Sequence, residues 1–85
     1  MKTTVLRYNV VIRKEGKHFI ADVPSLGISD FGTTLEQAKI NVSDAISCHI
    51  EGLVKTKTEI PPPDAKDFYV TQTEVSLPRS IKLVF

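Results

Sequence analysis

Residues 31–46 read FGTTLEQAKINVSDAI, and here the apolar residues change from a spacing of two to spacings of three and four. The Thr34 hydroxyl is placed to accept a hydrogen bond from the Gln37 amide, and the Gln37 side chain to reach back to the Thr34 amide, as in a capping box. The alternative register moves the cap to Thr33 with Glu36. Either register starts a helix here, and Glu36 lies near the positive end of its dipole.

The helix predicted behind this cap has one apolar side. Its stripe comprises Leu35, Ala38, Val42, Ala45, Ile46, His49 and Leu53. Three further apolar residues, Ile40, Ile50 and Val54, lie beside the centre of the stripe. In a monomer they would be half exposed, so they indicate a second contact surface on the helix.

Two alternating segments before the helix predict a β-hairpin. Residues 5–14 direct Leu6, Tyr8, Val10 and Ile12 to one face, and residues 18–23 do the same with Phe19, Ala21 and Val23. Gly16 lies between the two segments and can adopt the positive φ of a tight turn. Pro24 ends the second strand because it cannot donate to a sheet. A brief third strand is expected at residues 28–31, with Gly32 allowing the turn into the helix.

The sequence after the helix contains a proline run and then β-prone residues. Residues 60–63, IPPP, cannot continue a helix and favour an extended segment. DFYVTQTEVSL then reads as a strand, and a last apolar cluster follows it. We expect this segment to pair with a sheet, either its own or a partner's. The candidate association residues in it are Phe68, Tyr69, Ile81, Leu83 and Phe85.

These elements predict one α+β domain over residues 1–85. It consists of a three-stranded antiparallel meander, one amphipathic helix packed on it, and one or two closing strands. Residues 1–63 form the core module and residues 64–85 the closing strands. A chain of 85 residues buries a modest core, so association with a copy of itself or a partner is a reasonable expectation.

Charge and composition exclude several classes of function. The chain has 11 Lys and Arg against 10 Asp and Glu, a net charge of +1, whereas nucleic-acid-binding domains usually carry a clear basic excess. Cys48 is the only cysteine, so no disulfide forms within the chain. Neither a signal peptide nor an apolar run of about 20 residues is present. The cytosol is the expected location.

The residues that could carry chemistry fit no catalytic or metal-binding motif. Asp22, Asp30, Glu36 and Asp44 have no recognisable spacing, and the glycines form neither a phosphate loop nor a dinucleotide fingerprint. Cys48 and His49 are adjacent, so they diverge on a helix. We therefore expect no enzymatic activity, no metal and no cofactor.

The order of these motifs resembles the N-terminal domain of HicB-like antitoxins and their stand-alone relatives. The matching residues are Val23-Pro24 at the hairpin end, Leu26-Gly27 in the loop, Gly32 to Glu36 with Ala38 at the helix start, and Ile60-Pro61 after the helix. The match covers about residues 8 to 63. We assign structural roles in the motif to Pro24, Leu26, Gly27, Gly32, Thr34, Glu36 and Gln37. The family's fold is a degraded ribonuclease H-like or double-stranded-RNA-binding-like sheet and helix without nuclease carboxylates.

The chain departs from the family pattern in three places. The loop PSLG is one residue shorter than usual, Thr33 stands where aspartate is common, and Gln37 where glutamate is common. These changes preserve the turn and the cap. Family members that repress their own operon carry a helix-turn-helix or ribbon-helix-helix domain after this module. VSLPRSIKLVF is similar only to the strand that opens a ribbon-helix-helix, so no DNA binding is implied.

The resemblance implies a protein-binding module that forms a dimer or tetramer and masks a small toxin that cleaves mRNA. An RNA- or DNA-binding accessory protein and an oligomeric protein of another role are the alternatives, and a small hydrolase or nuclease is the least supported. Residues Ile40, Ile50 and Val54 and the apolar residues after the prolines are the candidate sites of association.

Overall fold

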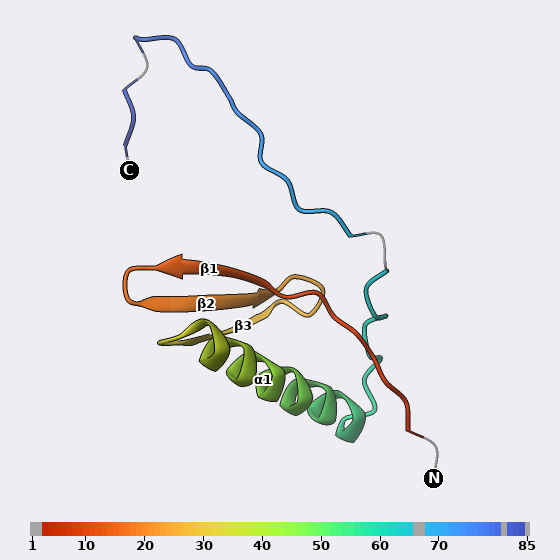
Figure 1. Ribbon diagram of the computed structural model, residues 1–85. Coiled ribbons are helices and arrows are strands. Elements are labelled where there is room, and N and C mark those ends of the chain that lie inside the picture. Colours follow the sequence, from red (N-terminus) through yellow and green to blue (C-terminus); the bar gives the residue numbers. More distant parts are fainter. Residues whose placement is uncertain (1–2, 66–67, 81, 85) are drawn as a thin grey trace.

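The computed structural model describes residues 3–65, 68–80 and 82–84 and shows one helix packed on a small antiparallel sheet (Figure 1). The strands β1 (Val11–Glu15), β2 (His18–Val23) and β3 (Ile28–Gly32) lie in the order β1-β2-β3. The helix α1 (Leu35–Lys55) follows them. The meander and its helix confirm the predicted α+β class. Among the described residues, no helix has the length and apolarity needed to cross a membrane.

The first strand is shorter than the alternation predicts. β1 begins at Val11, which pairs with Asp22 near the end of β2. β2 ends at Val23 because Pro24 has no amide proton to continue the ladder, so residues 5–10 have no strand beside them. On the predicted apolar face, Tyr8, Val10 and Ile12 pack against the core, whereas Leu6 is exposed.

The helix begins as the Thr34 register predicts. Thr34 has an extended backbone, with φ −131° and ψ 161°, and its hydroxyl accepts a hydrogen bond of 3.0 Å from the Gln37 amide. The second half of the capping box does not form. The Gln37 side chain instead donates to the Asn41 side-chain oxygen at 2.9 Å, because residues four apart are neighbours on a helix surface.

The helix ends in a Schellman motif built without glycine. The Lys57 amide donates to the Val54 carbonyl at 3.1 Å, and the Thr58 amide donates to the Leu53 carbonyl at 2.9 Å. Lys57 has a φ of 55°, the left-handed region that this motif requires. The chain therefore leaves the helix sharply and enters the proline run in an extended form.

The core consists of small side chains at the centre of the sheet and helix. Its fully buried residues are Ala21, Val23, Ala38 and Val42, all on the faces predicted from periodicity. The predicted stripe is buried only at its centre. Leu35 was expected in the core but is 43% exposed, because it lies in the first turn, at the end of the helix and beyond the buried positions.

Gly32 joins the sheet to the helix at a close approach. A Cβ atom at this position would lie 2.5 Å from the backbone nitrogen of Ala38. Only glycine fits there without a shift of backbone. The loop before β3 also follows the predicted motif, because Gly27 has a φ of 65° and Leu26 packs against the core.

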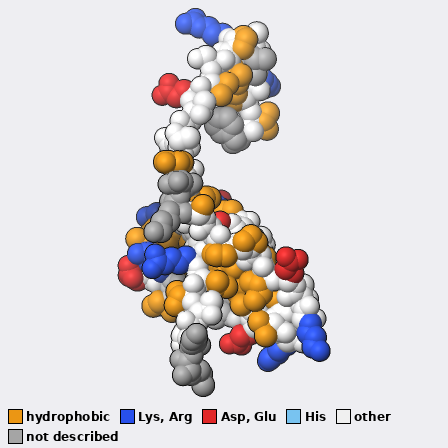
Figure 2. All heavy atoms as spheres, turned by 90° about the vertical axis from the view of Figure 1, so that its right-hand side faces the viewer, with side chains coloured by type: hydrophobic (Ala, Val, Ile, Leu, Met, Phe, Trp, Pro, Cys, Tyr) orange, Lys and Arg blue, Asp and Glu red, His pale blue; other side chains and the backbone are white. Residues whose placement is uncertain are grey.

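The closing strands predicted after the prolines do not form. Residues 68–80 and 82–84, which we call the arm, contain no strand and extend away from the rest of the molecule, which we call the body (Figure 1). Exposed hydrophobic side chains lie along the arm (Figure 2). A strand requires a neighbouring strand to satisfy its backbone, and the arm lies beside none. Ile81 and Phe85, two of the predicted association residues, lie outside the described residues.

Candidate protein interface

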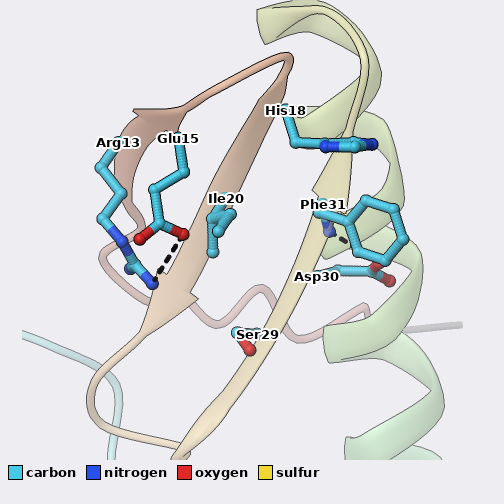
Figure 3. A pocket seen from close by; sticks show the side chains of 7 residues that line it. All are labelled: Arg13, Glu15, His18, Ile20, Ser29, Asp30 and Phe31. Carbon is cyan, nitrogen blue, oxygen red and sulfur yellow. Dashed lines mark hydrogen bonds and ion pairs between the residues drawn. The ribbon is translucent and has the colours of Figure 1, made fainter.

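The outer face of the sheet, opposite α1, is open and has an apolar centre. The register places Arg13, Ile20 and Phe31 side by side across the three strands. Phe31 is 58% exposed, and the His18 ring packs edge-on against it with ring centres 5.5 Å apart. These side chains line a shallow hollow of about 680 Å³ (Figure 3).

Charged groups surround this apolar centre. Arg13 pairs with Asp22 on the neighbouring strand. Its guanidinium also lies 3.9 Å from the Glu15 carboxylate on its own strand (Figure 3). Asp30 lines the same hollow at the β3 side. The rim therefore has three carboxylates against one guanidinium, arranged around exposed aromatic and aliphatic groups. An apolar centre with a polar rim is the usual anatomy of a protein-binding surface.

The β3 edge of the sheet is closed by side chains. The Phe31 amide donates to the Asp30 carboxylate at 2.8 Å, and the Phe31 carbonyl accepts from the Asn41 side-chain amide at 2.7 Å. Since the register bonds Ile28, Asp30 and Gly32 to β2, Phe31 is the central residue whose backbone faces outward on this edge. Both of its backbone groups are satisfied, so this edge is blunted against another strand.

A groove lies on the other side of the sheet, between β1 and the helix. α1 packs mainly on β3 and β2, because a helix about 10 Å wide covers about two strands spaced 4.8 Å apart. The groove has a volume of about 660 Å³. Its apolar lining comes from Leu6, Tyr8, Val10 and Ile12 on the strand side and from Val42 and Ile46 on the helix. The inner face of β1 is therefore incompletely covered.

Asp64 fastens the start of the C-terminal segment to the body. Its carboxylate accepts hydrogen bonds from the Asn9 amide, at 2.7 Å, and from the Ser25 hydroxyl. Its own amide donates to the Arg7 carbonyl at 3.0 Å. Nearby, the Tyr8 hydroxyl donates to the Pro61 carbonyl at 2.6 Å. We call this set of bonds the Asp64 latch.

The latch depends on the charge of the carboxylate. The hydrogen bond from the Asn9 amide, followed by that from the Ser25 hydroxyl, lowers the pKa of Asp64 below its ordinary value of 3.8, and partial desolvation opposes the shift. The latch thus holds the chain where it leaves the body. Sequence reasoning missed it, because a single aspartate after prolines gives no local signal of partners 39 and 55 residues away.

The structure divides the predicted site residues into two groups. The motif residues Pro24, Leu26, Gly27, Gly32, Thr34, Glu36 and Gln37 all lie in the loop, strand end and helix start that shape the body. The predicted association residues do not form one patch. Ile40 and Val54 are exposed on the same side of α1 but about 21 Å apart along it. Ile50 is half-buried, and Phe68, Tyr69 and Leu83 are exposed on the arm.

Sequence reasoning did not select Ile20 or Phe31 as interface residues. The signal was available for Ile20, which is the one apolar residue on the polar side of its alternating strand. Cys48 is an exposed free thiol. Within the described ranges, no three His, Cys, Asp or Glu side chains come together in a group able to hold a metal ion.

Together these features define a small α+β module in which one helix covers one face of a three-stranded sheet and leaves the other face open. The chain belongs to the UPF0150 family. It is 36% identical over 67 residues to UPF0150 protein Ta0767 from Thermoplasma acidophilum, an alignment that covers 76% of this chain and 97% of that protein.

A second relative comes from a bacteriophage. The chain is 35% identical over 81 residues to an uncharacterized 14.9 kDa protein in the rep-hol intergenic region of Haemophilus phage HP1. That alignment covers 82% of this chain and 61% of the phage protein, so the chain spans less than two thirds of this relative's length. No protein-family model and no solved structure matches the chain.

Proposed function

We propose that this chain is a non-catalytic protein-binding module of the HicB antitoxin type, and that it masks a small toxin that cleaves mRNA. The outer face of the sheet is the binding surface. The observation that carries this proposal is the open apolar centre formed by Ile20 and Phe31 inside a charged rim. An aromatic side chain in such a position is the kind of residue that dominates binding energy at protein interfaces.

The charge of this face supports a basic protein partner over a nucleic acid. An enzyme that binds RNA needs basic side chains to neutralise phosphates. The rim residues Glu15, Asp22 and Asp30 are complementary to such a surface, and only Arg13 among the rim groups is basic. Complementary charge speeds association and disfavours wrong partners. The same carboxylates would repel RNA or DNA, so the nucleic-acid-binding alternative has less support.

Membership of the UPF0150 family supports the proposal, together with the motifs that resemble the HicB N-terminal domain. Pro24 and Gly27 shape the loop and Gly32 the strand-to-helix turn, so these shared motif residues build the scaffold. The binding residues proposed here lie on the opposite side of the sheet. A scaffold of this kind with an independent binding face would allow different family members to bind different partners.

The proposal is tested by co-expressing this chain with the product of any small open reading frame that lies next to its gene. We expect that product to arrest growth alone and to be neutralised by this chain, with which it co-purifies. Phe31→Ala should weaken the complex by about 30-fold, equivalent to about 2 kcal/mol for an aromatic hot spot.

Val54→Ala is the matched control, because Val54 is 59% exposed but lies on the helix, away from the outer face. It should leave the affinity unchanged. A neighbouring product that is harmless and does not bind would contradict the toxin partner. Equal affinity of the Phe31 variant and the parent would contradict the assignment of the outer face.

A further inference from the structure

β1 is the open edge of the sheet. The two-residue turn makes Glu15 and His18 a hydrogen-bonded pair, so the alternate residues Arg13 and Val11 also bond to β2. The backbone groups of Ile12 and Lys14 consequently point away from the sheet. Among the described residues, no strand lies beside them. This edge therefore has unpaired amides and carbonyls, whereas side chains cap the backbone groups of Phe31 on the β3 edge.

The groove beneath this edge would receive the side chains of an added strand. In strand addition, backbone hydrogen bonds provide affinity and pockets for alternate side chains provide specificity. Here Val10 and Ile12 form one wall and Ile46 the other. Ile50 follows Ile46 by four residues, which continues this wall along the helix. The Asn9 side-chain amide nitrogen, at the end of the groove, is buried without an acceptor in the described part of the chain.

The arm contains a segment with the pattern that such a groove requires. Residues 71–77, TQTEVSL, alternate β-branched and apolar side chains with polar ones, and Pro78 ends the pattern. Val75 is 76% exposed and Leu77 57% exposed. Seven residues in a strand extend about 24 Å, at about 3.4 Å each, which is enough to follow β1 and the residues before it.

We propose that residues 71–77 of a second copy of this chain add to β1 as an antiparallel fourth strand. Val75 lies opposite Ile12 and Leu77 opposite Val10, so both apolar residues enter the groove. In the same register Glu74 lies opposite Arg13 on the outer face, an oppositely charged cross-strand pair. The outward-facing backbone groups of Ile12 and Lys14 bond to Val75 and Thr73. Reciprocal exchange of the two arms produces a closed dimer.

A second copy fits this arrangement better than the chain's own arm. The Asp64 latch fixes the chain shortly before the arm, beside Asn9 and near the beginning of β1. An antiparallel return onto the same β1 would require a reversal within residues 65–72. In that stretch, AKDFYVTQ, Asp67 is the one turn-favouring residue, and the aromatic and β-branched residues that follow it favour an extended chain. An arm that arrives from another copy requires no such turn.

The proposal is tested with two single-cysteine chains of different length, distinguished by a tag. One carries Arg13→Cys and the other Glu74→Cys, each with Cys48→Ser. Arg13 and Glu74 would form a non-hydrogen-bonded pair with Cα atoms ~4.5 Å apart, a separation that permits a disulfide. After mixing and mild oxidation, we expect a heterodimer that links the two variants, and little homodimer of either. A chain with Thr73→Cys in place of Glu74→Cys should cross-link poorly to the Arg13→Cys chain, because residue 73 lies on the opposite face of the added strand.

The other outcomes overturn the proposal in different ways. A homodimer through position 13 would show that two β1 edges pair with each other. A homodimer through position 74 would show that two arms pair with each other. If neither variant cross-links while a chain carrying both cysteines closes an internal disulfide, the arm pairs with its own β1. No cross-link in any combination contradicts strand addition altogether.

A second measurement uses the full chain without cysteines or oxidant. Leu77→Asp should weaken dimerisation in sedimentation experiments by at least tenfold, because the carboxylate would enter an apolar groove. Gln72→Asn, a neutral change on the polar side of the same segment, should change it less than twofold. Equal effects, or a parent chain that stays monomeric throughout, would contradict the proposal. Neither experiment contains a toxin, so their outcome is independent of the proposed function.

Discussion

The body and the arm have similarly apolar and β-prone sequences but opposite structural outcomes. In the body, the segments 11–15, 18–23 and 28–32 each have a neighbouring strand, and all three become strands. In the arm, residues 71–77 alternate equally well but have no neighbour and remain unpaired. The comparison teaches that alternation specifies the faces of a strand, whereas an available sheet edge decides whether the strand forms.

Because only the body, among the residues that the structure describes, has paired strands and a buried core, the body provides the stability of the isolated chain. Substitutions at its close contacts should therefore change the free energy of unfolding, and substitutions in the arm should not.

Gly32→Ala should destabilise the body by about 1–3 kcal/mol, the usual cost of overpacking. The added Cβ would meet the Ala38 nitrogen at 2.5 Å, and the backbone of the strand or the helix must shift. Chemical denaturation followed by circular dichroism measures the change. The matched control is Gly52→Ala, where a Cβ meets nothing within 4 Å. This variant should instead stabilise α1 by about 0.5–1 kcal/mol. Equal losses in both variants would contradict the close approach at Gly32.

Thr34→Ala should cost about 1 kcal/mol of unfolding free energy, because the Gln37 amide loses its acceptor. Thr33→Ala should have little effect, since Thr33 is exposed and does not cap the helix. Denaturation of the two variants under identical conditions compares them. A larger loss at Thr33 would show that the helix starts in the alternative register.

The Asp64 latch lies at the boundary between the two regions and should be sensitive to pH. Since the pKa of Asp64 is lower in the folded chain than its ordinary 3.8, the latch contributes its full stability well above that value. The contribution is lost as the pH falls through the lowered folded pKa. Denaturation of the parent and Asp64→Asn across this range should give a difference in stability that shrinks on acidification. A difference that stays constant with pH would contradict the charge dependence.

Tyr69→Ser should change the free energy of unfolding of the dilute chain by less than about 0.5 kcal/mol. Tyr69 is 85% exposed on the arm, so its removal loses almost no packing. Denaturation at low protein concentration isolates this effect from any association. A clear loss of stability there would mean that the arm packs on its own body.

Much of the fold could be predicted because it is recorded in local periodicity. The alternation around Ala21 and Val23 and the helical spacing of Ala38 and Val42 identified the four buried residues of the core. The cap at Thr34 was also a local signal. These features depend on residues within about one helical turn or strand of one another.

The features that the sequence did not predict depend on distant partners. β1 begins at Val11 because β2 ends at Val23, before Pro24, and the closing strands are absent because the arm has no edge beside it. Asp64 binds Asn9 and Ser25 across most of the chain. The apolar centre of the outer face could not be predicted, because Phe31 and Ile20 become neighbours only through the register of β2 and β3.

The openness of the β1 edge is tested most directly by residue-resolved amide hydrogen exchange at two protein concentrations. In dilute solution, the amides of Ile12 and Lys14 should exchange rapidly while the neighbouring Arg13 amide, bonded to β2, is protected. At high concentration, Ile12 and Lys14 should become protected together with Thr73 and Val75 of the arm. Protection of Ile12 and Lys14 equal to that of Arg13 at the lowest concentration would contradict an open edge. Rapid exchange of Ile12 and Lys14 at every concentration would contradict the addition of a strand to that edge.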